Sequence, residues 1–156
     1  MTGDRIWIEF DALVEPLAWG RNVYTVIRLD ASLEEAARTR RTRRVEGTVE
    51  DVAVNMGVNR ADVMPDAFAY VGKGLQRRLA VGPGEVVRCR LRPADPDHVP
   101  LPPDLRDALA DAGRLAAFES KPPAERRRLL QPVEEAARSE TRRRRIEALV
   151  RDLAPH

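Results

Sequence analysis

Residues 71–91, VGKGLQRRLAVGPGEVVRCRL, constrain the fold more than any other stretch of the chain. Leu75 and Leu79 lie four residues apart and therefore share one face of a helix. The segment Gly82-Pro83-Gly84 ends that helix, because glycine adopts positive φ and proline cannot continue the hydrogen-bond ladder. Apolar and arginine side chains then alternate up to Leu91, which is typical of a strand with one buried face. The pattern predicts a helix–glycine–strand unit, which specifies a fold better than a reaction.

Length and composition favour a globular protein. The chain has 156 residues, of which 43% are hydrophobic and 33% charged, so it can form one domain, or one domain with a helical extension. Cys89 is the single cysteine, which excludes an internal disulfide and a thiolate metal cluster. No apolar run approaches the ~20 residues of a membrane helix, and no signal-peptide pattern is present. We therefore expect a cytoplasmic protein without membrane insertion.

The sequence pattern predicts a mainly β structure for the first half of the chain. Alternation and β-branched content predict strands over residues 6–13 and 22–29, a pair that begins within 45–54, and a short strand over 67–71. Asp30 is a good N-cap for a short helix. The turn residues of three other segments predict a loop, a tight connection and a break, at residues 15–20, 55–60 and 64–66 respectively.

The second half reads as helical after an extended linker. Pro93 to Pro103 holds five of the 12 prolines, so we place a boundary there, with a first domain at residues 1–97 and a helical region at 98–156. Helices are predicted to start at Pro102-Pro103 and Pro122-Pro123. The clearest helix spans Thr141 to Leu153, with Ser139 as its N-cap.

Several motifs of the chain resemble the YdeI/OmpD-associated family, and they lie mostly in the second half. They are Leu101-Pro102-Pro103-Asp104-Leu105, Ala108-Leu109, Phe118, Glu140-Thr141-Arg142 and Arg145-Ile146. The resemblance extends by pattern to roughly residues 6–153, although residues 45–64 depart from the family's Gly-rich hairpin. It implies a mainly β plus α fold, in which a small closed β-barrel of about six strands carries a C-terminal helical appendage. It also implies a stress-protection setting, against bacteriocins or antimicrobial peptides, and supplies no catalytic residues.

A non-enzymatic binding module is the function that we favour from the sequence. Aromatic bodies with a few polar groups suit a pocket or groove of the barrel for a small molecule or peptide. The candidate ligand-binding residues are Trp19, Tyr24, Asn55, Asn59, Tyr70 and Arg88. For each residue taken singly, an ordinary core or surface role is the competing interpretation. A homodimer is a further expectation, because small barrels often cover an open strand edge with a second copy.

Two other functions stay open. Nucleic-acid binding would use the arginine runs at 38–44 and 142–145, although aromatic residues are only 4% of the chain and leave few stacking platforms. An enzyme would need the carboxylates Glu9, Asp11, Glu50 and Asp51 to converge on one face, with Arg88 or Arg90 as an anion clamp.

The remaining reactive residue types point away from catalysis. His98 lies in the proline-rich linker and His156 is the last residue, so neither supports a triad or a metal site. Cys89 alternates inward with Val87 and Leu91, as a small hydrophobe does. We accordingly assign no catalytic residue, no metal and no cofactor.

Overall fold

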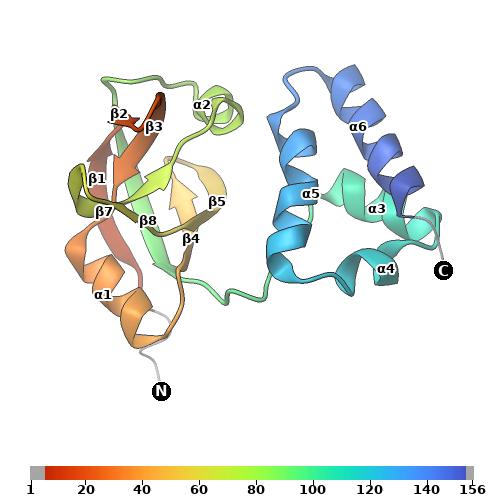
Figure 1. Cartoon of the computed structure of the whole chain (residues 1–156), viewed down its shortest axis with the longest axis horizontal. Coiled ribbons are helices and arrows are strands. Elements are labelled where there is room, and N and C mark those ends of the chain that lie inside the picture. The colour runs from red at the N-terminus through yellow and green to blue at the C-terminus, as the bar shows by residue number, and fades with distance from the viewer. Residues whose placement is uncertain (1–5, 154–156) are drawn as a thin grey trace. The chain divides into compact units, whose positions relative to one another are not determined.

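The computed structural model describes residues 6–153 and divides into two compact units, Met1–Pro96 and Asp97–His156. The first is β-rich and the second is helical (Figure 1). We describe them as the β unit and the helical unit, each by itself.

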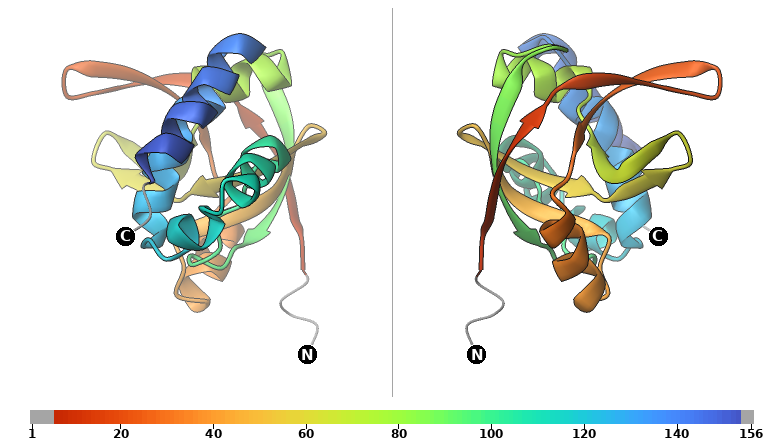
Figure 2. Two further views of the ribbon diagram at one scale, coloured as in Figure 1. Left: turned by 90° about the vertical axis from the view of Figure 1, so that its right-hand side faces the viewer. Right: turned by 90° about the vertical axis from the view of Figure 1, so that its left-hand side faces the viewer.

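Eight strands of the β unit form two four-stranded antiparallel sheets. The first sheet has the order β1 (Ile8–Leu13), β8 (Val86–Pro93), β4 (Arg44–Val49), β5 (Val52–Gly57). The second has the order β2 (Glu15–Trp19), β3 (Asn22–Arg28), β7 (Met64–Tyr70), β6 (Asn59–Ala61). Figure 2 shows the β2–β3 hairpin projecting from the rest of the β unit.

The closed barrel of about six strands, expected from the resemblance, is wrong. Neither sheet closes: β1 and β5 are the edges of the first sheet, and β2 and β6 are the edges of the second. Two of these edge strands, β2 and β6, fall in segments where turn residues predicted a loop and a tight connection. Pro16 lies within β2, and an edge strand tolerates proline because one side of its backbone needs no ladder hydrogen bond.

One hydrophobic core fills the space between the two sheets. The inward faces of β1 and β8 contribute Phe10 and Leu91, and the inward face of β3 contributes Ile27. Two helices add to this core, α1 (Ala31–Thr39) through Leu33 and α2 (Lys73–Leu79) through Leu79. The predicted order of helix, glycine turn and strand is confirmed, since α2 is followed by β8, in which every second residue is buried up to Leu91. The helix ends earlier than predicted, because Ala80, before Gly82, adopts the left-handed conformation.

Start signals in the sequence located most helices. Asp30 caps α1 by accepting a hydrogen bond from the Ser32 backbone N–H at 3.1 Å, as predicted. The two proline pairs also begin helices, as expected. Ser139, expected as a cap, is instead the first residue of its helix, and Arg138 is the N-cap.

The helical unit contains α3 (Pro103–Asp111), α4 (Leu115–Glu119), α5 (Pro123–Glu135) and α6 (Ser139–Asp152). Their apolar stripes enclose a separate core, which contains Leu105, Leu109, Phe118, Leu130, Val133, Ile146 and Leu149. Within the described part of the chain, no helix combines the length and the apolar character that crossing a bilayer requires.

Candidate functional site

Three of the six candidate residues meet on the outer face of the second sheet. The strand register sets Tyr24 opposite Leu17, Tyr70 opposite Val26 and Phe68 opposite Arg28. Residues that are directly opposite in an antiparallel pair point to the same face, so these side chains gather on the side away from the main core. Four aromatic rings of this face form what we call the aromatic cluster: Trp19, Tyr24, Phe68 and Tyr70.

The rings of the aromatic cluster contact one another in a closed circuit. The Trp19 ring centroid lies 6.4 Å from that of Tyr24 and 6.4 Å from that of Phe68. Tyr70 closes the circuit, at 5.3 Å from Tyr24 and 5.5 Å from Phe68. Most of these pairs are edge-to-face, which aromatic quadrupoles favour. The arrangement is therefore a packed group of rings and not four independent side chains.

The aromatic cluster combines buried and solvent-exposed rings. Phe68 is fully buried, whereas Trp19 is 36% exposed and Tyr70 is 40% exposed. Partial burial raises the pKa of the Tyr70 hydroxyl, and the neighbouring Tyr24 adds to that rise. The Tyr24 hydroxyl accepts a hydrogen bond from Asn22 Nδ2 at 3.3 Å. The exposed rims thus offer apolar area together with phenolic hydroxyls.

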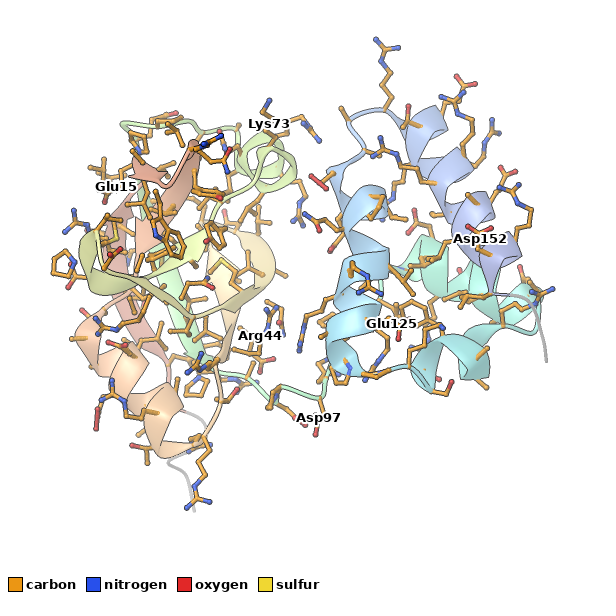
Figure 3. The ribbon with its side chains drawn as sticks, viewed as in Figure 1. Glu15, Arg44, Lys73, Asp97, Glu125 and Asp152 are labelled. Carbon is orange, nitrogen blue, oxygen red and sulfur yellow. The ribbon has the colours of Figure 1, made fainter. Side chains whose placement is uncertain are left out.

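The other three candidates, Asn55, Asn59 and Arg88, are not part of the aromatic cluster. Arg44 (labelled in Figure 3) holds the Asn55 amide on the first sheet, with Nη2 donating to Oδ1 at 2.6 Å. Asn59 on β6 donates to the Phe68 carbonyl at 3.4 Å, so it lies beside the aromatic cluster but turns its amide to the backbone. Arg88 is on the outer face of the first sheet. The structure does not bring Asn55 and Arg88 to the aromatic cluster.

Three of the four carboxylates considered for catalysis contact Arg88. Asp11 and Glu9 lie 3.2 and 3.7 Å from the Arg88 guanidinium. Glu50 accepts the Arg88 backbone N–H at its side-chain Oε2 at 2.6 Å and donates its own backbone N–H to the Arg88 carbonyl at 2.7 Å. Its carboxylate thus takes the place of a backbone acceptor beyond the end of β4. Asp51 is exposed in the β4–β5 turn. No two of these carboxylates form an acid–base pair in a cleft.

Metal-ligating and nucleophilic groups do not converge in the described chain. Across residues 6–153 there is no group of three His, Cys, Asp or Glu residues that could hold a metal ion. Cys89 is buried, and desolvation raises the pKa of its thiol to about 12, which suits a core hydrophobe and not a nucleophile. His98 is exposed, and His156 lies outside the described residues.

Sequence analysis missed a groove on the β unit, which we call the basic groove. It encloses about 620 Å³ between the end of α1, the α1–β4 connection and the start of β6. Its lining consists of Glu34, Ala37, Arg38, Arg41, Thr42, Arg43, Val58, Asn59 and Arg60. The arginine run at 38–44 was the available signal, but nothing in the sequence indicated that Arg60 lies beside it.

The second arginine run holds the helical unit together. Arg142 forms an ion pair with Asp104 of α3 and donates Nη1 to the Val133 carbonyl at 3.2 Å. Arg145 donates Nη1 to the Pro132 carbonyl at 2.6 Å. Both carbonyls belong to the last turn of α5, where few N–H groups remain to satisfy them. The Val133 carbonyl also accepts the Ala136 N–H at 3.3 Å. Two arginines of the run, Arg142 and Arg145, therefore connect helices within the helical unit.

Comparison with known proteins gives a family match for the helical unit. Residues 98–155 match the model of the family described as bacteriocin-protection, YdeI or OmpD-associated. The match confirms the suspected family and lies within the helical unit. A search of curated proteins and a search of solved structures found no significant match.

Proposed function

We propose, from the premise that the helical unit matches the bacteriocin-protection, YdeI or OmpD-associated family, that the protein is a non-enzymatic peptide-binding module. The aromatic cluster is the binding surface, and an extended peptide segment with apolar side chains is the occupant. Protection against a bacteriocin requires contact with a polypeptide or with the machinery on which it acts, and a peptide-binding surface supplies that contact.

The observation that carries the proposal is the exposure of Trp19 and Tyr70, at 36% and 40%, above the fully buried Phe68. Large rigid rings give much contact area for little loss of conformational entropy, and their polar tips accept varied partners. Such rings dominate binding energy where they are supported from beneath. Phe68 and Val26 give that support.

The edge strand β2 favours an extended peptide over a compact ligand. β2 pairs only with β3, so its other edge presents backbone groups to which a peptide strand can add. Trp19 is the last residue of β2, which places a large ring where an added strand would place its side chains. Pro16 restricts the added hydrogen bonds to part of this edge.

Single-tryptophan fluorescence tests the proposal directly. The variant Trp7→Phe leaves Trp19 as the only tryptophan, since the chain has two. Titration with ten-residue peptides that alternate apolar and polar residues and lack tryptophan should shift the Trp19 emission to shorter wavelength in a saturable way. Tyr70→Ala should weaken binding by about tenfold, the effect of losing roughly 1.4 kcal/mol at an aromatic contact.

A matched control distinguishes binding at the aromatic cluster from nonspecific binding to exposed apolar residues. Val86 on the first sheet is 63% exposed, and Val86→Ala should bind the same peptides as the parent. Equal affinity of Tyr70→Ala and the parent would contradict the proposal. An emission shift that depends on protein concentration without peptide would instead assign the surface to a second copy of the chain.

A further inference from the structure

An ion pair between Arg60 and the largely buried Glu34 fixes one wall of the basic groove. The Arg60 guanidinium donates Nε to Glu34 Oε2 at 2.7 Å and a second hydrogen bond to Glu34 Oε1. Arg60 Nη1 also donates to the Pro65 carbonyl at 2.9 Å. The Glu34 side chain is only 15% exposed, and the hydrogen bond from Arg60 lowers the pKa of its carboxyl. This wall is preorganised and its charge is balanced.

The remaining lining is positively charged. Arg38 is shared between Glu35, at 2.9 Å, and Glu34, at 3.7 Å. Arg41 and Arg43 are exposed, and within residues 6–153 neither guanidinium has an acidic partner. Glu34 is the only carboxylate among the lining residues, against four arginines. The groove therefore carries a surplus of positive charge on Arg41 and Arg43.

The backbone of Arg41 adopts a conformation that glycine would fit better. Its φ is +56°, in the left-handed region that glycine adopts most readily. It ends α1 in a Schellman arrangement, with the Arg41 N–H on the Arg38 carbonyl and the Thr42 N–H on the Ala37 carbonyl, both at 3.0 Å. Glycine is the usual residue at this position of the motif, and an arginine there accepts backbone strain. Arg41→Gly would therefore remove the guanidinium and relieve the backbone at the same time.

We propose that the basic groove binds a small phosphorylated molecule, through the guanidiniums of Arg41 and Arg43. A guanidinium presents a planar fork of donors that matches two phosphate oxygens. The volume of about 620 Å³ lies in the range of small-molecule sites. None of the nine lining residues is aromatic, so the groove has no platform on which a nucleic-acid base could stack. The ligand is therefore recognised by its phosphates.

Isothermal titration of the full chain with inorganic tripolyphosphate tests this site. Arg41→Gly is the decisive variant, because glycine fits the backbone conformation and the change should leave the melting temperature equal or higher. It should weaken tripolyphosphate binding by about tenfold, as expected for a lost charge-assisted contact. Arg41→Gly combined with Arg43→Gln should remove measurable binding. Arg21→Gln, which removes one equal charge from the exposed β2–β3 turn, is the control and should bind as the parent does.

Comparison of ligands separates the chemical sources of the phosphate. ATP should bind about as tightly as tripolyphosphate, and citrate, which carries carboxylates in place of phosphates, should bind much more weakly. Citrate binding of equal strength would overturn the assignment to phosphate. ATP binding that is much tighter would show base recognition and overturn a phosphate-only site. A DNA duplex that binds more tightly than tripolyphosphate, or an equal loss in Arg21→Gln and Arg41→Gly, would also overturn the proposal. The peptide titration and this one use different variants, so each can fail alone.

Discussion

Arg142 binds Asp104 through two parallel hydrogen bonds, from Nε to Oδ2 at 2.7 Å and from Nη2 to Oδ1 at 3.0 Å. The two residues are 38 positions apart, on α6 and α3. They belong to two of the short motifs by which the chain resembles the YdeI/OmpD-associated family, and the fold brings those motifs into contact. Arg142 also reaches the end of α5 through the Val133 carbonyl, so one guanidinium joins three helices.

Removal of this connector should destabilise the helical unit. Arg142→Ala deletes a partly exposed bidentate ion pair and one of the two donors to the Val133 carbonyl, which keeps the Ala136 N–H. We expect a loss of about 1 kcal/mol in the free energy of unfolding. The measurement is urea unfolding followed by circular dichroism at 222 nm. Arg144→Ala is the control, since Arg144 is an exposed residue of the same helix. A loss in Arg144→Ala as large as that in Arg142→Ala would contradict the prediction.

Acid should weaken the same connection. The Arg142 hydrogen bond lowers the pKa of the Asp104 carboxyl in the folded chain. A carboxyl whose folded pKa lies below its unfolded value of about 4 stabilises the fold above pH 4, and this contribution is lost as the pH falls through the folded pKa. Asp104→Asn should therefore be less stable than the parent at pH 6, and the difference should shrink towards pH 2. Urea midpoints at several pH values test this, and a difference that does not change with pH would count against it.

Cys89 should be chemically silent in the folded protein. Its thiol is buried and its pKa is raised to about 12, whereas the unfolded thiol ionises near pH 8.5–9. A disulfide reagent at pH 8 should react only after guanidinium is added. Because the folded state holds this proton longer than the unfolded state, the Cys89 contribution to stability falls as the pH rises from about 9 towards 12. Cys89→Ala should show a smaller loss over that alkaline range.

Gly47 should not tolerate a side chain. Its φ is +144°, and a Cβ there would lie 2.1 Å from the Arg90 carbonyl oxygen and 2.9 Å from the Trp7 ring. The Trp7 ring in turn carries the Arg90 guanidinium at 4.2 Å and the Arg92 guanidinium at 4.3 Å. Gly47→Ala must therefore push β4 away from β8, at a cost of about 3 kcal/mol or more.

Tryptophan fluorescence measures that effect, since both tryptophans lie in the β unit. Gly72→Ala is the matched control, because a Cβ at Gly72 meets nothing within 4 Å. Similar unfolding midpoints for the two variants would show that β4 and β8 can separate at low cost.

The sequence predicted elements better than it predicted their partners. Alternation at Val87 and Leu91 and the cap at Asp30 are local signals, and the strand and helix that they indicate are present. Strand pairing is not local: β4 pairs with β8 across some 40 residues, and no periodicity encodes that choice. The barrel prediction failed at this level. β2 and β6 were also missed, because short edge strands with proline or turn residues resemble loops.

For the candidate site, too, the sequence indicated residue types and left out the tertiary contacts that bring them together. Trp19, Tyr24 and Tyr70 were chosen by residue type, but only the register of Val26 with Tyr70 places β7 rings beside β3 rings. The arginine run at 38–44 was visible in the sequence, where it was considered for nucleic-acid binding. The groove exists because Arg60, from β6, binds Glu34 of α1, and that contact depends on tertiary structure.

The two ends of the motif Glu140-Thr141-Arg142 to Arg145-Ile146 have been described as connectors to α3 and to the last turn of α5. The contacts of this motif join helices to one another, and they do not by themselves indicate a ligand. In another chain with the same motif, we expect the two arginines to form the same contacts between helices. Its activity must be sought on whatever surface its own companion unit provides.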